Sequence, residues 1–272
     1  MSGKSLHHYF KEYAKIVNFN IFAFMKKLLL IASMLISLGC QAKVDQYVVK
    51  VVNEYPHDVK SYTQGLFFKD GVMYESTGQW GESTFRIVNL KTGKAEKKLD
   101  FDRKYFLEGS IILGDNLYIL TWTNKVVFVY DAVTLKYKQT YSYPREGWGL
   151  TTDGENLIAS DGSDRIYFLD PNLKLKKTIH VKLNGKAVKY INEMEMIDGK
   201  IWANVYMTDM ILIINPENGE VTGQIDCTGL LPKELRTPST DVLNGIAVND
   251  GRIYLTGKYW PRVYEIQLQK RR

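Results

Sequence analysis

One carboxylate, Glu108, opens an apolar stretch that ends in a tryptophan, Trp122. The stretch reads YFLEGSIILGDNLYILTW over residues 105–122. A glutamate in an apolar, partly dry setting holds its proton more tightly than one in water, because burial disfavours the charged form. Its pKa then moves toward neutrality, where a carboxyl group is suited to accept and donate protons. Glu108 is therefore a candidate general acid/base.

Polar residues recur at the position of Glu108 in a pattern that repeats along the chain. Each repeat has a short apolar strand, a Gly/Asp turn and a second strand, with turn glycines Gly71, Gly114, Gly154, Gly199 and Gly251. Six positions before the first turn residue, the repeats carry Gln64, Glu108, Gly147, Asn192 and Asn244. If the repeats surround an axis, the four polar residues form a ring at one depth, with Trp148 beside the glycine.

A five-bladed β-propeller accounts for these repeats. Their turn glycines are 43, 40, 45 and 52 residues apart, a third strand follows each hairpin, and a Lys/Thr-rich fourth strand follows in the first four repeats. Alternating apolar residues around glycine turns indicate hairpins, so the chain is predicted to be all-β. Five four-stranded sheets around an axis expose only short edges. The fifth repeat lacks a fourth strand, and we expect residues 44–55 to supply it and close the ring.

A second set of residues follows the second strands. Seven positions after the turn glycines come Gly78, Thr121, Asp161, Tyr206 and Lys258, with Trp122 one position further. We expect this set on one face of the propeller. Trp122, Trp148 and Trp260 all lie near predicted strand ends, which favours a pocket wall, although tryptophans also fill ordinary cores. Polar channel residues can also hold water or tie blades together.

Residues 1–42 read as a leader, followed by one domain over 43–272. From Met25, MKKLLLIASMLISLGCQA has two lysines, a short apolar run and small residues, which is the plan of a secretory signal peptide. Met25 is then the true start. Cleavage after Ala42 would release the protein, whereas cleavage before Cys40 would make it a lipoprotein, although Ser37 stands where such a motif usually has leucine. We therefore predict an exported protein, either periplasmic or lipid-anchored to the cell envelope through Cys40.

Composition excludes several classes of function. Residues 1–42 hold five of the 36 basic and one of the 30 acidic residues, so the remainder has a net charge of only +2 and no basic patch that predicts nucleic-acid binding. His57, His180 and Cys227 are the histidines and cysteine left in the domain. They are too few for a zinc site, and no disulfide forms within the domain. His57 reads as a turn residue and His180 as part of an outer strand.

Glu193 and Glu195 alternate with Met194 and Met196. This alternation is typical of a half-buried strand, and a channel-facing role for either glutamate is the alternative. The acidic turn DGSD at 161–164 has too few ligands to predict a calcium site. A structural metal such as calcium in the channel is therefore kept as an alternative, and no particular residues are predicted to bind it.

Several motifs, in one order from Tyr55 to Ile266, resemble the plant-type glutaminyl-peptide cyclotransferases, which have bacterial members. They read YPHDVKSYTQGL, YESTGQWGES, FLEGS, LTW, EGWGLTTDG, NEMEM, WANVY, VLNGIAV and TGKYWP. The resemblance implies a five-bladed propeller that converts the N-terminal glutamine of peptides or proteins into pyroglutamate with loss of ammonia. Such an enzyme is an aminoacyltransferase and requires no metal.

The resemblance also implies roles for individual residues. Glu108 matches the family's proposed acid/base glutamate, although Leu107 replaces the usual glycine before it. Tyr62 and Tyr206 also depart from the family pattern, which has phenylalanine and tryptophan there. The predicted catalytic residues are Glu108, Lys258 and Asn192. The predicted substrate-binding residues are Gln64, Tyr62, Trp122, Trp148, Tyr206 and Asn244.

Two rival hypotheses belong to other classes. A non-catalytic exported propeller that binds a peptide or glycan at the channel mouth would keep Trp122 and Trp148 but would need neither Glu108 nor Lys258. A zinc-dependent cyclotransferase of the animal type lacks its metal ligands here and conflicts with the all-β pattern. The preferred hypothesis is a monomeric enzyme acting on peptides or proteins with an N-terminal glutamine, with contact to a membrane only through an anchor at Cys40.

Overall fold

The computed structural model describes residues 11, 13, 26 and 43–271 of a chain that divides into two units, Met1–Ala42 and Lys43–Arg272. The predicted leader, with Met25, Cys40 and both cleavage positions, lies outside the described residues apart from Lys11, Tyr13 and Lys26. No helix among the described residues is long and apolar enough to cross a membrane. The candidate site lies in the second unit.

The second unit is built from five four-stranded units, called blades 1 to 5. Blade 1 contains β2 (Thr63–Lys69), β3 (Val72–Thr77), β4 (Thr84–Asn89) and β5 (Lys94–Asp100). Blade 2 contains β6 (Leu107–Leu113), β7 (Asn116–Thr121), β8 (Val126–Asp131) and β9 (Tyr137–Ser142). Blade 3 contains β10 (Leu150–Thr152), β11 (Leu157–Ser160), β12 (Arg165–Leu169) and β13 (Leu175–His180). Blade 4 contains β16 (Ile191–Ile197), β17 (Lys200–Val205), β18 (Met210–Ile214) and β19 (Val221–Asp226).

Blade 5 combines the two ends of this unit. Its strands β20 (Leu243–Asn249), β21 (Arg252–Gly257) and β22 (Arg262–Lys270) come last in the chain, and β1 (Asp45–Pro56) pairs antiparallel with β22 as the outer strand. The first residues of β1 also pair in parallel with β19 of blade 4, which joins blades 4 and 5 into one sheet. The predicted closure of the last blade by residues 44–55 is confirmed.

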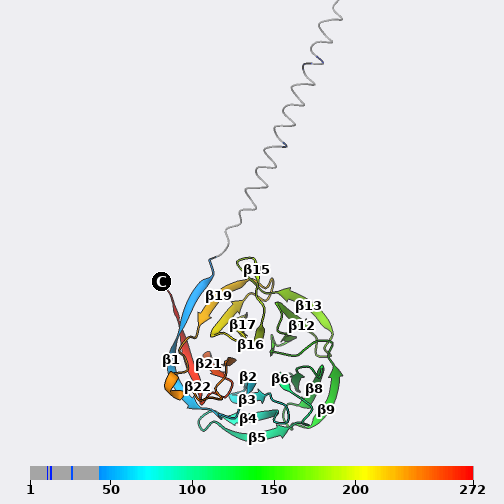
Figure 1. Cartoon of the computed structure of the whole chain (residues 1–272). Helices are drawn as coiled ribbons and strands as arrows, with labels where there is room; N and C mark the ends of the chain where they lie inside the picture. Colours follow the sequence, from blue (N-terminus) through cyan, green and yellow to red (C-terminus); the bar gives the residue numbers. More distant parts are fainter. Residues whose placement is uncertain (1–10, 12, 14–25, 27–42, 272) are drawn as a thin grey trace, which may run out of the picture. The chain divides into compact units, whose positions relative to one another are not determined.

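The first strand of each blade lies innermost. Figure 1 shows β2, β6 and β16 near the centre and β5, β9, β13 and β19 at the rim. Each inner strand contacts the inner strands of both neighbouring blades, in the cyclic order β2, β6, β10, β16, β20. These contacts close the ring around a central channel, so the predicted all-β five-bladed propeller is confirmed.

A β-bulge interrupts the inner strand of four blades at the predicted polar ring. The pairing register shifts between Thr63 and Gly65 in blade 1, and at the equivalent places in blades 2, 4 and 5. The ring residues Gln64, Glu108, Asn192 and Asn244 lie inside these irregularities. A bulge leaves one residue unpaired and re-aims its side chain, so each ring residue is freed from the strict alternation of the strand.

Glycine allows the inner strands to approach one another beside this ring. The backbone N–H of Gly109 donates to the carbonyl oxygen of Trp148 in blade 3, at 2.7 Å. A Cβ at Gly109 would lie 2.5 Å from the backbone nitrogen of Leu150. Any larger residue would push blades 2 and 3 apart next to Glu108.

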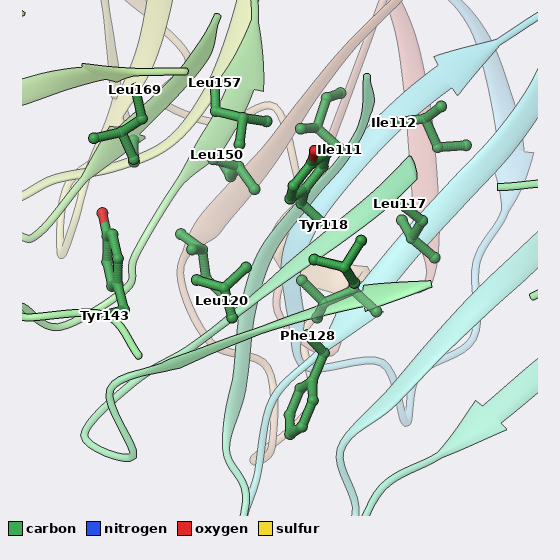
Figure 2. Packing of buried hydrophobic residues seen from close by; sticks show 14 of the residues in the cluster. Ile111, Ile112, Leu117, Tyr118, Leu120, Phe128, Tyr143, Leu150, Leu157 and Leu169 are labelled. Atoms are coloured by element: carbon green, nitrogen blue, oxygen red, sulfur yellow. The ribbon is translucent and has the colours of Figure 1, made fainter. Parts of the chain in front are cut away.

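The hydrophobic cores lie between the blades. Figure 2 shows Leu117, Leu120 and Phe128 of blade 2 in the same cluster as Leu150, Leu157 and Leu169 of blade 3. Similar clusters join blades 3 and 4, blades 4 and 5, and blades 5 and 1. Because apolar burial is the main stabilising contribution to folding, this face-to-face packing holds the inner strands and their side chains at fixed positions.

Two small elements add to the blades. The hairpin of β14 (Lys182–Leu183) and β15 (Lys186–Ala187) follows blade 3 and had no counterpart in the sequence-based prediction. The 3₁₀ helix η1 (Lys233–Leu235) lies in the loop before blade 5.

Candidate active site

A cavity of about 170 Å³ lies where the inner strands begin. It is lined by Tyr62, Gln64, Gln79, Phe106, Glu108, Trp122, Trp148, Asn192, Tyr206 and Lys258. Eight of the nine predicted site residues are therefore brought together from five loops and three inner strands. The start of each inner strand and the end of each second strand meet on the same face, because these neighbours are antiparallel. This topology explains how residues nearly 200 positions apart share one cavity.

Glu108 has few partners for a buried carboxyl group. Its side chain is 5 % exposed, and Oε1 accepts one hydrogen bond, from Nε2 of Gln64 at 3.1 Å. Oε2 has no hydrogen-bond partner within residues 43–271. Burial raises the pKa of Glu108 well above its usual value, the charge of Lys258 opposes this rise, and the charge of Glu146 adds to it. The carboxyl group therefore holds its proton more tightly than a glutamate in water.

Lys258 lies between two tyrosine rings. Its Nζ is 4.5 Å from the ring centroid of Tyr62 and 5.0 Å from that of Tyr206, which are cation–π distances. Burial lowers the pKa of Lys258, and the negative charges of Glu108 and Asp241 oppose the decrease. Lys258 makes no ion pair with Glu108 within 4.0 Å among the described residues. Its ammonium group is thus held by aromatic faces, and its donors stay available.

Glu146 fixes the two tryptophans of the cavity. Its Oε2 accepts hydrogen bonds from Nε1 of Trp122, at 2.8 Å, and from Nε1 of Trp148, at 3.2 Å. Trp148 also meets Tyr206 edge to face, with centroids 5.6 Å apart. One carboxylate therefore sets the orientation of both indoles. Glu146 does not stand out in the sequence, because the other repeats have no acidic residue at the equivalent position.

Asn192 presents an unsatisfied polar group at the cavity. The residue is 2 % exposed, and its Oδ1 has no hydrogen-bond partner among the described residues. A buried amide oxygen without a partner costs free energy, of the order of 1–3 kcal/mol. A ligand that donates a hydrogen bond at this place would relieve that cost.

Asn244 lies behind the cavity and does not line it. Its Nδ2 donates to the backbone oxygen of Thr63 at 2.9 Å and contacts Oε1 of Gln64 at 3.4 Å. Gln64 in turn donates to Glu108. The three side chains thus form a chain of hydrogen bonds around the ring, in which Asn244 orients Gln64 and Gln64 orients Glu108.

Two further tryptophans differ from the prediction: one lies in the core, and the other lies beside rings that line the cavity. Trp260, which was expected in a pocket wall, is 1 % exposed and packs in the core between blades 4 and 5. Its Nε1 donates to the backbone oxygen of Asp241 at 2.9 Å. Trp80, which was not singled out, is about half exposed and lies 6.5 Å from Trp122 and 5.6 Å from Phe106 between ring centroids. The aromatic surroundings therefore extend outward over blade 1.

Glu193 and Glu195 are both buried. Glu193 accepts hydrogen bonds from the backbone N–H of Ile246, at 2.8 Å, and of Leu66, at 3.3 Å, and so ties blade 4 to blades 5 and 1. Glu195 accepts from Thr151 at 3.0 Å, and burial raises its pKa to about 8. Neither residue lines the cavity of Glu108. Within the described residues, no three His, Cys, Asp or Glu side chains gather as a metal site.

His57 is more than a turn residue. Its ring lies buried between blades 1 and 5, with Nε2 2.9 Å from Oε1 of Glu75 and Nδ1 2.8 Å from the carbonyl oxygen of Trp260. Both ring nitrogens face acceptors, so both donate and the ring is charged. Glu75 also accepts from Ser61 at 3.1 Å and from Thr63 at 2.7 Å. This group stabilises the closure of the ring next to Gln64.

The fold and this cavity together define a five-bladed β-propeller with a cavity at one end of its channel, lined by a buried carboxyl group and two indoles. The glutamine cyclotransferase family model matches residues 25–268. A glutaminyl-peptide cyclotransferase of Arabidopsis thaliana is 40 % identical over 231 residues, which cover 82 % of this chain and 72 % of the relative. The chain belongs to the glutamine cyclotransferase family.

A solved structure is similar along its whole length. The crystal structure of Myxococcus xanthus glutaminyl cyclase superposes with a TM-score of 0.79 at 35 % sequence identity. The similarity covers 85 % of this chain and 100 % of that chain. The fold expected from the repeats is thus also the fold of a relative in the same family.

Proposed function

We propose that the protein is a glutaminyl-peptide cyclotransferase, which converts an N-terminal glutamine of a peptide or protein into pyroglutamate with release of ammonia. Family membership and the name of the Arabidopsis relative support this activity. The observation that carries it is Glu108, buried with a raised pKa and one unpartnered oxygen in a cavity between two fixed indoles.

The reaction requires a proton to move between two nitrogens. The neutral α-amine attacks the γ-carboxamide carbon, which forms the ring C–N bond and a tetrahedral intermediate. The bond to the side-chain nitrogen then breaks, and ammonia leaves. Glu108, as a carboxylate, takes the proton that the amine loses and gives it to the departing nitrogen, so it returns to its initial state. A raised pKa suits both transfers, because neither the acid nor the base form is too weak.

The remaining cavity residues stabilise the tetrahedral intermediate and orient the substrate glutamine. Lys258 is placed to donate to the oxygen that becomes negative in the tetrahedral intermediate, and Asn192 supplies an amide group beside it. Trp122 and Trp148 enclose the methylenes of the glutamine side chain and exclude water. Ring closure is already intramolecular, so holding the reactive rotamer provides much of the acceleration. The chain from Asn244 through Gln64 positions the carboxyl group of Glu108.

The cavity suits the end of a polypeptide chain. Its volume of about 170 Å³ lies below the ~300–1,000 Å³ typical of sites for drug-sized ligands and matches a single residue. The chemistry uses protons and hydrogen bonds only, so activity without an added metal is part of the proposal. We also propose export, supported by the signal-like sequence from Met25. The mass of the mature N-terminus distinguishes cleavage after Ala42 from lipidation at Cys40.

The activity is tested by ammonia release from a short peptide that begins with glutamine, with mass spectrometry of the peptide. We expect loss of one ammonia per peptide, unchanged by a chelator, and no release from the same peptide with an acetylated N-terminus. Binding of the peptide by folded protein without ammonia release would instead support the non-catalytic binding propeller. Activity abolished by the chelator and restored by a metal would contradict the metal-independent chemistry.

A further inference from the structure

A second cavity, of about 270 Å³, lies beside the cavity of Glu108. One wall is formed by Met207, Thr208 and Asp209, in the loop between β17 and β18. The other wall is formed by Arg236 and by residues 240–242, in the loop before β20. No role in the proposed reaction uses these residues.

Neighbouring residues of the chain line the two cavities. Tyr206 lines the cavity of Glu108, and the next residue, Met207, lines the second cavity. On the other side, the backbone N–H of Asp241 donates to the oxygen of Lys258 at 3.0 Å, and the N–H of Lys258 donates to the oxygen of Val242 at 2.9 Å. The charge of Asp241 also contributes to raising the pKa of Tyr206. The loops that carry Tyr206 and Lys258 thus also line the second cavity or bond to its wall.

The second cavity carries charges without partners. Within residues 43–271, the side chains of Asp209 and Arg236 make no hydrogen bond and no ion pair. The carboxylate of Asp241 accepts a hydrogen bond from the neighbouring N–H of Val242, at 2.8 Å, and interacts with the hydroxyl group of Tyr62, whose pKa is raised by burial and by Asp241. Asp209 and Asp241 are partly buried, whereas Arg236 is exposed, so the interior of the cavity is negative. Met207, 67 % exposed at its edge, offers an apolar surface to a long side chain.

We propose that this cavity binds the second residue of the substrate and favours a basic side chain there, with Asp209 as the ion-pair partner. This inference rests on the proposed function, because it assumes that a glutamine occupies the cavity of Glu108. The methylenes of a lysine or arginine pack against Met207 while the charged end reaches the unpaired carboxylate of Asp209. An acidic residue at the second position meets two carboxylates instead.

The test compares ammonia release from peptides that begin Gln-Lys, Gln-Ala and Gln-Glu, at low and at high salt. For the wild type at low salt we expect kcat/KM for Gln-Lys to exceed that for Gln-Glu roughly threefold to tenfold, as for partly exposed charge pairs. Added salt narrows this ratio, because it screens exposed charges. The peptides also differ in the pKa of their α-amine, so the ratio is compared between protein variants.

Two variants are expected to change the ratio of kcat/KM for Gln-Lys to kcat/KM for Gln-Glu in opposite directions. Asp209→Asn lowers the Gln-Lys to Gln-Glu ratio of kcat/KM, chiefly through KM. It leaves the backbone hydrogen bond from Cys227 to the oxygen of residue 209 in place. Arg236→Gln raises the ratio. Asp198→Asn is the matched control: it makes the same charge change in blade 4 at the exposed turn after β16, where φ is 48°, a conformation that asparagine tolerates.

The outcomes separate the two proposals. Equal kcat/KM for Gln-Lys and Gln-Glu in the wild type at low salt, or a preference that Asp209→Asn leaves unchanged, overturns this inference while ammonia release upholds the cyclotransferase. A folded protein that releases no ammonia from any of the three peptides overturns both.

Discussion

Glu75 and Glu108 are buried glutamates of neighbouring blades, and their pKa values are shifted in opposite directions. Glu75, in β3, is 1 % exposed, and its oxygens accept from His57, Ser61 and Thr63. Glu108, in β6, is 5 % exposed and, among the described residues, accepts only from Gln64. Although burial acts against the charged form in both, the pKa of Glu75 is lowered and that of Glu108 is raised.

The number and charge of the partners account for this difference. The charge of His57 lies in contact with Glu75, and two hydroxyl groups complete its hydrogen bonds, so the carboxylate form is stabilised. Around Glu108, the cation of Lys258 lies further away and Glu146 adds a negative charge. Burial by itself therefore does not make a carboxyl group reactive. A buried glutamate becomes a candidate for proton transfer when few hydrogen-bond donors and no close cation stabilise its carboxylate form.

The largest expected effect comes from Glu108→Gln. The substitution keeps the size of the side chain and removes the proton exchange, so we expect kcat for ammonia release to fall roughly 10²–10⁴-fold. The melting temperature should stay unchanged or rise, because glutamine avoids the cost of a buried charge. Steady-state kinetics and thermal unfolding check both parts. Activity within tenfold of the wild type in a folded variant would remove Glu108 from the mechanism.

The next largest effect is on the free energy of unfolding and concerns the partner of Glu75. His57→Gln leaves the carboxylate of Glu75 buried without its cation, and we expect unfolding to become easier by about 3–5 kcal/mol. The folded pKa of His57 is raised, so its contribution is complete below about pH 6.5 and is lost as the pH rises through the folded value. The folded pKa of Glu75 is lowered, so its contribution is present above about pH 4.5 and is lost as the pH falls. The difference from the wild type is therefore largest between about pH 4.5 and 6.5.

His180 provides the matched control for this experiment. It pairs with Asp164 at 2.9 Å, but its side chain is 55 % exposed. His180→Gln should cost less than about 1 kcal/mol, because water replaces an exposed ion pair at little loss. Chemical denaturation of both variants between pH 4 and pH 8 gives the comparison. Equal costs for the two substitutions, or a cost at His57 that does not vary with pH, would contradict the charged pair.

Much of the fold could be predicted from the sequence, because repetition makes the same local signal appear five times. The glycine turns and alternating apolar residues locate the hairpins, and the missing fourth strand of the last repeat predicts the role of β1. The hairpin β14–β15 escaped prediction since it belongs to no repeat. Its two-residue strands carry too few residues to show a period.

Site residues that follow the repeat or the family motifs could be predicted from the sequence. Site residues outside both patterns could not. Gln64 and Glu108 recur at one position of the pattern, so their meeting was expected. Glu146 precedes the ring position in a single blade, and only its contacts with two indoles reveal its role. Trp260 resembles the cavity tryptophans in sequence, but a side chain at a strand end can turn toward the core or the channel, and the pattern does not distinguish the two.

The smallest expected effects concern the pKa of Glu108 itself. Glu146→Gln removes a negative charge that adds to the raised pKa of Glu108, so that pKa should fall. Lys258→Met removes a positive charge that lowers it, so the pKa should rise. Infrared spectroscopy can follow the carboxyl stretch that is absent in Glu108→Gln as the pH is varied. Glu82→Gln, on the exposed β3–β4 loop, is the charge-matched control and should leave the titration in place. Shifts in the same direction for Glu146→Gln and Lys258→Met would mean that packing, and not the balance of charges, sets the protonation of Glu108.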